Sequence, residues 1–383
     1  MAEVLANTPE NLALGAAALA QGKLVAFPTE TVYGLGGNAL MESAVRRIYA
    51  VKGRPATDPL ICHVDLPEKA LQLWDGQRDP AAVALAQAIG AALWPGPLTI
   101  VCRAAPHLPD CVTGGSGCVG ARVPNHPVAL ALLRLVDFPV AGPSANTFGH
   151  VSPTTAAHVY ADLAPRDAEL LIVDGGSCAV GIESTVVKVI SEHAIEVLRR
   201  GRVTVGDIQA AIATTHPHTQ MTIRDTRSKF AVADAPQDGP GQMLTHYSPR
   251  VSASLLTPAS IATLDALRRD GSATQRIVVQ RGPATYLLAK TALIDYSGIL
   301  QAYKGDVLAY FDLSAEGDVD EACFRVFQAL RWSEEVAGVE NVVFPFLSEW
   351  PQVKSQSELL EAVEDRLFRA ASGTVASLAV LEE

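Results

Sequence analysis

The sequence predicts an α/β (α+β) protein that has a larger first domain and a smaller second domain of Rossmann-like α/β type. Its 383 residues are enough for two hydrophobic cores. Apolar residues alternate between helical and strand spacing along most of the chain. That pattern weakens between 211 and 250 into Thr, His, Pro, Asp and Gly. We therefore expect a first domain over 1–210, a linker or lid over 211–250 and a second domain over 251–373.

The expected elements of the first domain follow from the spacing of their apolar residues. Ala and Leu recur at helical spacing over 9–21, whereas the short run at 24–27 is continuously apolar and suits a buried strand. The same criteria predict further helices at 43–51, 80–93 and 128–135, and further strands at 60–64, 98–102, 119–123, 170–173 and 185–190.

Regular patterns resume after the Gly and Pro residues at 239–241, which strongly disfavour helix or strand. The second domain is expected to begin with a strand at 251–256. Strands are further expected at 276–280 and 306–310, and helices at 261–269, 321–336 and 358–371.

Composition and charge exclude several classes of protein. Hydrophobic residues make up 49% and charged residues 19%, which is typical of a packed globular enzyme. We expect a cytoplasmic protein, because no apolar run is long enough for a membrane helix and no basic segment precedes the first apolar stretch. The net charge of −11 opposes a broad phosphate-binding surface, so little direct nucleic-acid binding is expected. The six cysteines form no C-x-x-C pair, which disfavours a zinc site.

The densest motif is PTETVYGLG at 28–36, directly after an apolar strand. Its glycines let a ligand approach the backbone, and its hydroxyls and carboxylate supply donors and acceptors. From this motif alone, a ligand-binding turn and a purely structural turn are equally good interpretations.

Two cations lie close together in Lys52-Gly53-Arg54-Pro55, and Asp58 follows. A lysine point charge and a planar guanidinium suit the oxygens of a polyphosphate. A basic surface turn is the alternative, and it would be favoured if the cluster stood alone.

Arg122 lies in the predicted strand at 119–123, within GARVP. An arginine that points from a strand into apolar surroundings needs an anion, so Arg122 could bind a substrate carboxylate. A buried pair with a protein carboxylate is nearly as good an interpretation. Ser144, Asn146 and Ser152 could contact a nucleotide or cap helices. For the segment around Trp94, a role in packing and turn geometry is a better interpretation than contact with a ligand.

Seven short motifs follow one another along the chain: PTETVYGLG, KGRPxxxPL, WPGPLT, ARVPxHP, GPSAN, GIESTVV and HYSP. In this order the chain resembles the YrdC-domain family of threonylcarbamoyl-AMP synthases, strongly over about residues 10 to 250, and its C-terminal part looks like the extra domain of the two-domain form. The resemblance implies a twisted mixed sheet that bounds a concave, positively lined cavity.

The resemblance also implies two sets of site residues, with Lys52 and Arg54 as catalytic groups. Cys118 departs from the family by standing where a hydroxyl residue is common, Arg200 replaces a usual proline beside Arg199, and Lys188 stands where an acidic residue is frequent. The implied threonine site comprises Thr31, His63, Arg122, Ser144 and Ser184. The implied ATP site comprises Lys52, Arg54, Asp58, Cys118, Gly142, Asn146, Ser152, Arg199 and, from the linker, His246.

The implied reaction makes threonylcarbamoyl-AMP and pyrophosphate from ATP, L-threonine and bicarbonate, for threonylcarbamoyladenosine in tRNA. Mg²⁺ is expected to accompany ATP, and a tRNA threonylcarbamoyl transferase is expected to accept the product. Two alternatives stay open, which are a carbamoyltransferase-like enzyme and an RNA-binding module with the same fold.

Overall fold

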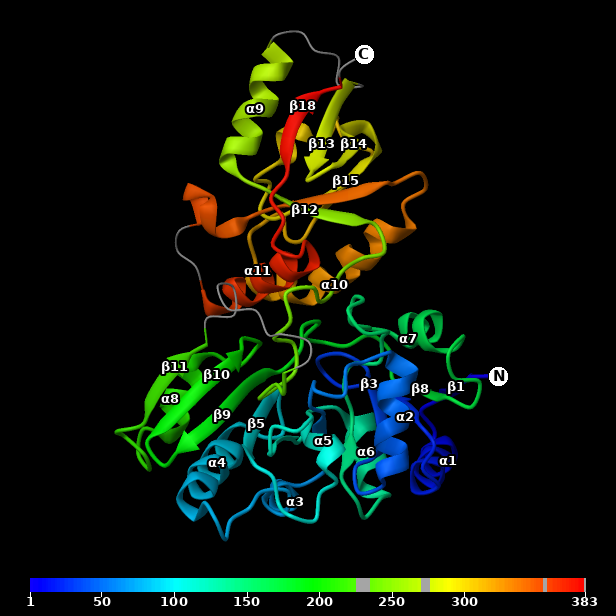
Figure 1. Cartoon of the computed structure of the whole chain (residues 1–383), viewed down its shortest axis with the longest axis vertical. Coiled ribbons are helices and arrows are strands. Elements are labelled where there is room, and N and C mark those ends of the chain that lie inside the picture. The colour runs from blue at the N-terminus through cyan, green and yellow to red at the C-terminus, as the bar shows by residue number, and fades with distance from the viewer. Residues whose placement is uncertain (225–234, 270–275, 354–356, 382–383) are drawn as a thin grey trace. The chain divides into compact units, whose positions relative to one another are not determined.

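The computed structural model describes residues 1–224, 235–269, 276–353 and 357–381 (Figure 1). The chain forms two compact units. The first comprises residues 1–148 and 152–243, and the second comprises 149–151 and 244–383. The segment expected as a linker is thus divided between the two units.

The first unit is organised around one large mixed sheet of 11 strands in its described part. The sheet contains both parallel pairs, such as β4 with β6, and antiparallel pairs, such as β4 with β7, which gives the predicted mixed sheet. In spatial order the strands are β1 (Glu3–Ala6), β8 (Leu171–Asp174), β2 (Val25–Phe27), β3 (Gly34–Asn38), β7 (Val140–Ala141), β4 (Ile61–His63), β6 (Cys118–Arg122), β5 (Leu98–Arg103), β9 (Thr185–Ser191), β10 (Ala194–Arg199) and β11 (Gln220–Ile223).

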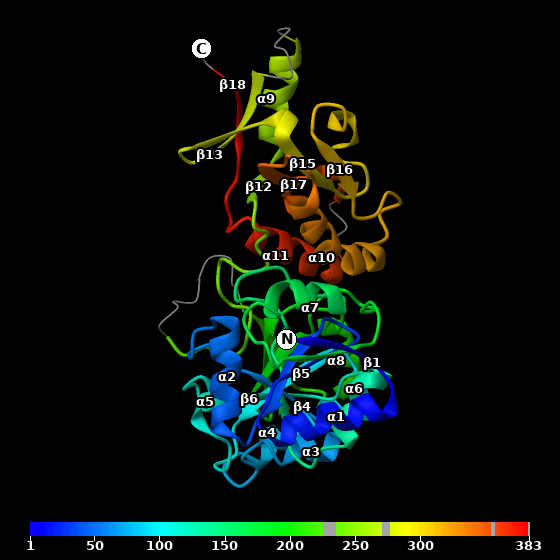
Figure 2. The ribbon, with the colours of Figure 1, turned by 90° about the vertical axis from the view of Figure 1, so that its right-hand side faces the viewer.

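Helices cover both faces of this sheet, and their ends follow from local sequence. The side chain of Thr8 caps the first helix, and Gly53 in the left-handed conformation ends the second. Figures 1 and 2 show these helices around the sheet. They are α1 (Pro9–Ala20), α2 (Glu42–Lys52), α3 (Pro67–Leu71), α4 (Pro80–Leu93), α5 (Asp110–Thr113), α6 (Pro127–Arg134), α7 (Ala156–Leu163) and α8 (Val205–Ile212).

Two apolar cores hold the helices to the sheet. One lies between α1, α6 and the strands β2, β7 and β8, with Leu19, Phe27 and Leu132 fully buried. The other lies on α2, α4 and α7 and includes Ile48 and Leu85. Burial of this apolar surface fixes the strand ends that present the polar residues of the site.

The second unit contains a parallel sheet in the order β12 (Ser252–Leu256), β17 (Asn341–Pro345), β15 (Thr291–Asp295) and β16 (Ala309–Asp312). Helices α10 (Val319–Glu335) and α11 (Glu358–Ala370) pack side by side, as Figures 1 and 2 both show. The remaining elements are α9 (Pro258–Arg269) and an antiparallel sheet of β14 (Ala284–Leu287), β13 (Ile277–Arg281) and β18 (Ser377–Val380). The parallel sheet, with α9 following β12 and α10 connecting β16 to β17, agrees with the predicted Rossmann-like α/β class.

Two local expectations need correction, and two central strands were missed. The expected linker contains a strand, because β11 pairs in parallel with β10 and extends the large sheet. The strand expected at 306–310 instead begins at Ala309. Strands β15 and β17, which lie at the centre of the second unit's parallel sheet, were not predicted.

Among the described residues, no helix combines the length and the apolar character that a membrane crossing requires.

Candidate functional site

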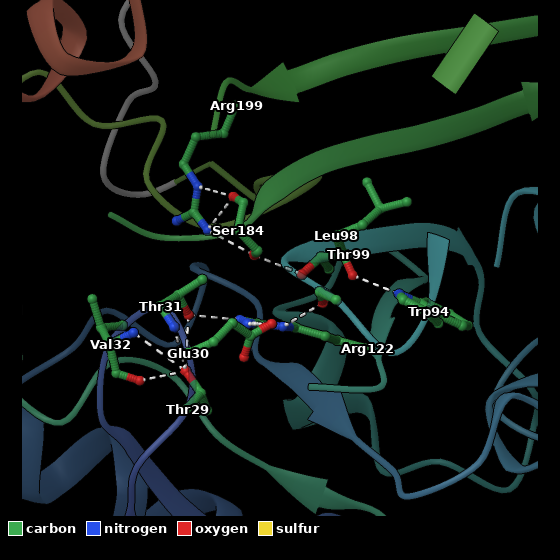
Figure 3. Close-up of polar contacts among 11 residues, drawn as sticks. Thr29, Glu30, Thr31, Val32, Trp94, Leu98, Thr99, Arg122, Ser184 and Arg199 are labelled. Carbon is green, nitrogen blue, oxygen red and sulfur yellow. Dashed lines mark hydrogen bonds and ion pairs between the residues drawn. The ribbon is translucent and has the colours of Figure 1, made fainter. Parts of the chain in front are cut away.

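The turn after β2 is fixed by one of its own hydroxyl groups (Figure 3). Thr29 Oγ1 accepts hydrogen bonds from the backbone N–H groups of Thr31 and Val32, both at 3.2 Å, and lies 2.6 Å from the carbonyl of Val32. This side-chain-to-backbone pattern is typical of a hydroxyl-stabilised turn. The turn therefore holds Glu30 and Thr31 in fixed positions at the end of a buried strand.

Arg122, at the end of β6, binds this turn. Its Nη2 lies 2.8 Å from Glu30 Oε1, and both side chains are buried. Nη1 donates to Thr31 Oγ1 at 3.0 Å, and Nε donates to the Gly96 carbonyl at 3.3 Å. The buried arginine thus has a protein carboxylate as partner, which was the alternative interpretation of its position.

His63 is the neighbour of Arg122 across the β4–β6 pair. Burial, and secondarily the charge of Arg122, lowers the pKa of His63 to about 3, so the imidazole is neutral near neutral pH. Its ring packs edge-on against Phe27, with 5.6 Å between the ring centroids. A Cβ atom at Gly142 would lie 3.1 Å from His63 Nδ1, so the glycine leaves room for the imidazole.

Lys52 joins the end of α2 to the loop after β7. Its Nζ donates to the backbone carbonyls of Ser144 and Asn146, at 2.5 and 2.6 Å. The side chain is 1% exposed, and burial, with Arg54 as a second cause, lowers its pKa well below the ordinary value. An anion beside this amine would favour its charged form.

Arg54 and Asp58 form a buried ion pair, with 2.9 Å between Nη2 and Oδ1. Arg54 also donates to the carbonyls of Asp58 and Pro59. Burial raises the pKa of Asp58, although the charges of Arg54, Lys52 and Arg199 oppose this rise. One carboxylate therefore lies within the electrostatic influence of three cationic side chains.

Ser184 links the start of β9 to β5 and β10 (Figure 3). Its hydroxyl lies 2.8 Å from Thr99 Oγ1 and accepts from Arg199 Nη2 at 3.2 Å. Arg199 also donates through Nε and Nη2 to the Ser184 carbonyl. These contacts connect a residue expected in the threonine site to one expected in the ATP site.

Three expected ATP-site residues have other surroundings. Ser152 is buried and donates to Glu183 Oε1 at 2.5 Å. Cys118 is half-buried at the start of β6, and burial raises the pKa of its thiol. His246 belongs to the second unit, where its backbone N–H donates to the carbonyl of Arg369.

Part of the expected linker is fastened to the first unit. The backbone N–H of Gln237 donates to the carbonyl of Thr57 at 3.0 Å, next to Asp58. Asp238 forms ion pairs with Lys188 at 2.6 Å and with Arg224 at 2.8 Å. Lys188, a departure from the family pattern, therefore binds the linker by charge.

The first unit thus brings the expected residues into contacting groups. One group contains Arg122 and Thr31, with His63 next to Arg122 across the strand pair, and another contains Lys52 with the backbone of Ser144 and Asn146. The role of Glu30 was not predicted, although it lies inside the quoted motif next to Thr31. The available signal was its place inside a motif that directly follows a buried strand.

Among the described residues, no group of three or more His, Cys, Asp or Glu side chains could hold a metal ion.

Two family models match most of the chain. One, described as telomere recombination, matches residues 17–201, and the other, described as the C-terminal domain of threonylcarbamoyl-AMP synthase, matches residues 203–372.

Curated proteins and solved structures give the same relationship. The chain is 39% identical over 236 residues to a threonylcarbamoyl-AMP synthase of Pyrococcus abyssi, covering 62% of this chain and 65% of the relative. It is 41% identical over 249 residues to a threonylcarbamoyl-AMP synthase of Bacillus subtilis, covering 64% and 66%. These alignments span slightly less than two thirds of each relative. A crystal structure of P. abyssi Sua5 complexed with L-threonine is similar, with a TM-score of 0.75, 30% identity and coverage of 97% of both chains.

Proposed function

Because the chain belongs to the threonylcarbamoyl-AMP synthase family, we propose that it converts ATP, L-threonine and bicarbonate into threonylcarbamoyl-AMP and pyrophosphate. In this reaction it is a nucleotidyltransferase, since it transfers the adenylyl group of ATP to a carboxylate. The product supplies the threonylcarbamoyl group of a modified tRNA adenosine.

The proposed ATP site lies in the first unit and is built around three cationic side chains. Lys52, Arg54 and Arg199 would neutralise the triphosphate, and Asp58 fixes Arg54 by their 2.9 Å ion pair. The further residues of the first unit proposed to contact ATP are Cys118 through its backbone, Gly142, Asn146 and Ser152; the prediction for His246 concerns a residue of the second unit.

The proposed threonine site lies around Arg122. Its guanidinium binds the substrate carboxylate, and the hydroxyl of Thr31, 3.0 Å from Nη1, helps to orient it. Neutral His63 lines this site without adding charge. Ser144 and Ser184 complete the proposed set.

The proposed chemistry requires no covalent protein intermediate. Threonine's amine captures bicarbonate as an N-carboxylate, which attacks the α-phosphorus of ATP and displaces pyrophosphate. Residues that position two anions and neutralise their charge are sufficient for such a step. Mg²⁺ would accompany ATP, held mostly by its phosphate oxygens and water, and would neutralise part of the phosphate charge.

The observation that carries this proposal is a single unit that holds both a buried Arg122 and the Lys52, Arg54 and Arg199 group. The test is pyrophosphate release by the full-length protein. We expect release from ATP only when L-threonine and bicarbonate are both present. Release that depends instead on carbamoyl phosphate would favour the carbamoyltransferase alternative and refute the proposal.

A cytoplasmic location and transfer of the product to tRNA by a partner transferase belong to the same proposal. The partner would be identified by product-dependent formation of the modified tRNA when the two purified proteins are combined.

A further inference from the structure

Resting on the proposed function, we propose that Glu30 binds the α-ammonium group of threonine and accepts a proton from it, which prepares the amine for carboxylation. Glu30 and Arg122 would thus act as a matched pair for a zwitterionic amino acid.

The geometry of Glu30 supports direct contact with the substrate. Its carboxylate lies 2.8 Å from Arg122 Nη2, the group proposed to bind the substrate carboxylate. The side chain is only 6% exposed, yet neither of its carboxylate oxygens takes a hydrogen bond from a described residue. A buried carboxylate normally has several donors, so an incoming ammonium group would supply what the protein does not.

The charge balance of this end of the site also matches a zwitterion. One guanidinium faces one carboxylate, and the two compensate each other before substrate binds. An amino acid brings one charge of each sign, so its carboxylate can pair with Arg122 and its ammonium with Glu30. Neither protein charge is then left buried without a partner, which would be costly.

The proton is assigned to Glu30 because its carboxylate is the one paired with Arg122. His126 and Cys178 also face it electrostatically, but burial lowers the pKa of His126 and raises the pKa of Cys178 to about 12. His63, beside Arg122, has a pKa of about 3 and is a weak base.

The proposed step is balanced. The N–H bond of the ammonium breaks, and its proton passes to the Glu30 carboxylate, leaving a neutral amine. The amine nitrogen then forms a bond to the carbon of bicarbonate, and the departing hydroxide takes a second proton from nitrogen and leaves as water. The product is the N-carboxylate, and Glu30 returns its proton to solvent.

The first test measures binding to full-length Glu30→Gln by calorimetry. We expect the affinity for L-threonine to fall by about tenfold or more. The affinity for 3-hydroxybutyrate, which keeps the carboxylate and hydroxyl but lacks the amine, should not fall. Equal weakening of both ligands, or tighter L-threonine binding, would show that Glu30 only neutralises Arg122.

The second test measures pyrophosphate release as a function of pH. For Glu30→Gln, we expect kcat/KM for threonine to fall about 100-fold near neutral pH, and to recover as alkaline pH deprotonates threonine itself. A loss that is equal at every pH, or no loss, would overturn the proton transfer. The matched control is Glu192→Gln, since Glu192 is exposed in the β9–β10 turn.

Glu30→Asp keeps the negative charge beside Arg122 and guards against a folding failure of the glutamine variant. Moving the carboxylate back by one methylene should lower kcat/KM while the melting temperature stays near that of the wild type; unchanged kcat/KM would contradict the proposal. Absence of threonine- and bicarbonate-dependent release by the wild-type protein would instead refute the proposed function itself.

Discussion

The two ends of the candidate site differ in charge balance. Around Arg122, one cation faces one carboxylate on a turn fixed by its own hydroxyl. Around Lys52 and Arg54, three cationic side chains act on the carboxylate of Asp58, and Asp162 and Arg166 act on Lys52 as well. A balanced pair suits a zwitterion, whereas an excess of positive charge suits a polyphosphate. Charge, more than shape, distinguishes the two proposed subsites.

The largest effect on one subsite alone is expected for Arg122→Ala. It removes the partner of the threonine carboxylate and leaves Glu30 as a buried unpaired charge, so threonine binding should weaken by about 2 to 5 kcal/mol. ATP binding should change much less. Calorimetry with each ligand provides the measurement, and unchanged threonine affinity would disprove the assignment. Arg122→Lys is a useful companion, because it keeps the charge but loses the planar fork.

The complementary change is Lys52→Met, which keeps most of the side-chain volume. We expect ATP affinity to fall by about 10- to 100-fold, since a charge-assisted hydrogen bond contributes about 1.5 to 3 kcal/mol. Threonine affinity should change little. Lys69→Met is the control, because Lys69 forms a partly exposed ion pair with Asp65. Equal losses for both ligands would mean that Lys52 acts mainly by holding the Ser144 loop.

The pKa of His63 predicts how stability depends on pH. The folded-state pKa of about 3 lies below the ordinary value of 6.5, so the unfolded chain binds the proton first. The stability due to neutral His63 is complete above pH 6.5 and is lost as pH falls toward 3. Between pH 7 and pH 5 this amounts to about 2 kcal/mol. Denaturant unfolding should show that His63→Asn loses less stability over this range, and an identical loss would refute the account.

The smallest expected effect comes from Asp238→Asn, at the point where the linker is tied to the first unit. Asp238 is partly exposed and pairs with Lys188 and Arg224, so the change should cost about 1 kcal/mol or less. Faster proteolysis near residue 238 and lower turnover would reveal release of the linker. Wild-type values in both measurements would remove any role for this attachment.

Helices and apolar strands could be predicted from the sequence because the spacing of their apolar residues indicates which side chains are buried. Strand β3 could not, because GLGGN contains no β-branched or aromatic residue and its strand conformation depends on pairing with β2 and β7. Strand β7 has only two residues, too few for a period. Strand β11 is mostly exposed, and its four residues are too few for the alternation of Met221 and Ile223 with polar residues to establish a period.

The candidate site, too, could be predicted only in part from the sequence. Motifs predicted which residues to consider, and the structure brings Thr31 to Arg122 and Lys52 to the Ser144 loop. The partner of Arg122 could not be deduced, because 92 positions separate Glu30 from it and only the sheet order makes them neighbours. Spacing along the chain does not encode such long-range ion pairs.

The most direct test of the account is a crystal structure of the protein with L-threonine and a non-hydrolysable ATP analogue. The account predicts the threonine carboxylate on Arg122, its amino group on Glu30, and the triphosphate beside Lys52 and Arg54. A triphosphate bound at Arg122, or threonine bound away from the Glu30–Arg122 pair, would contradict it.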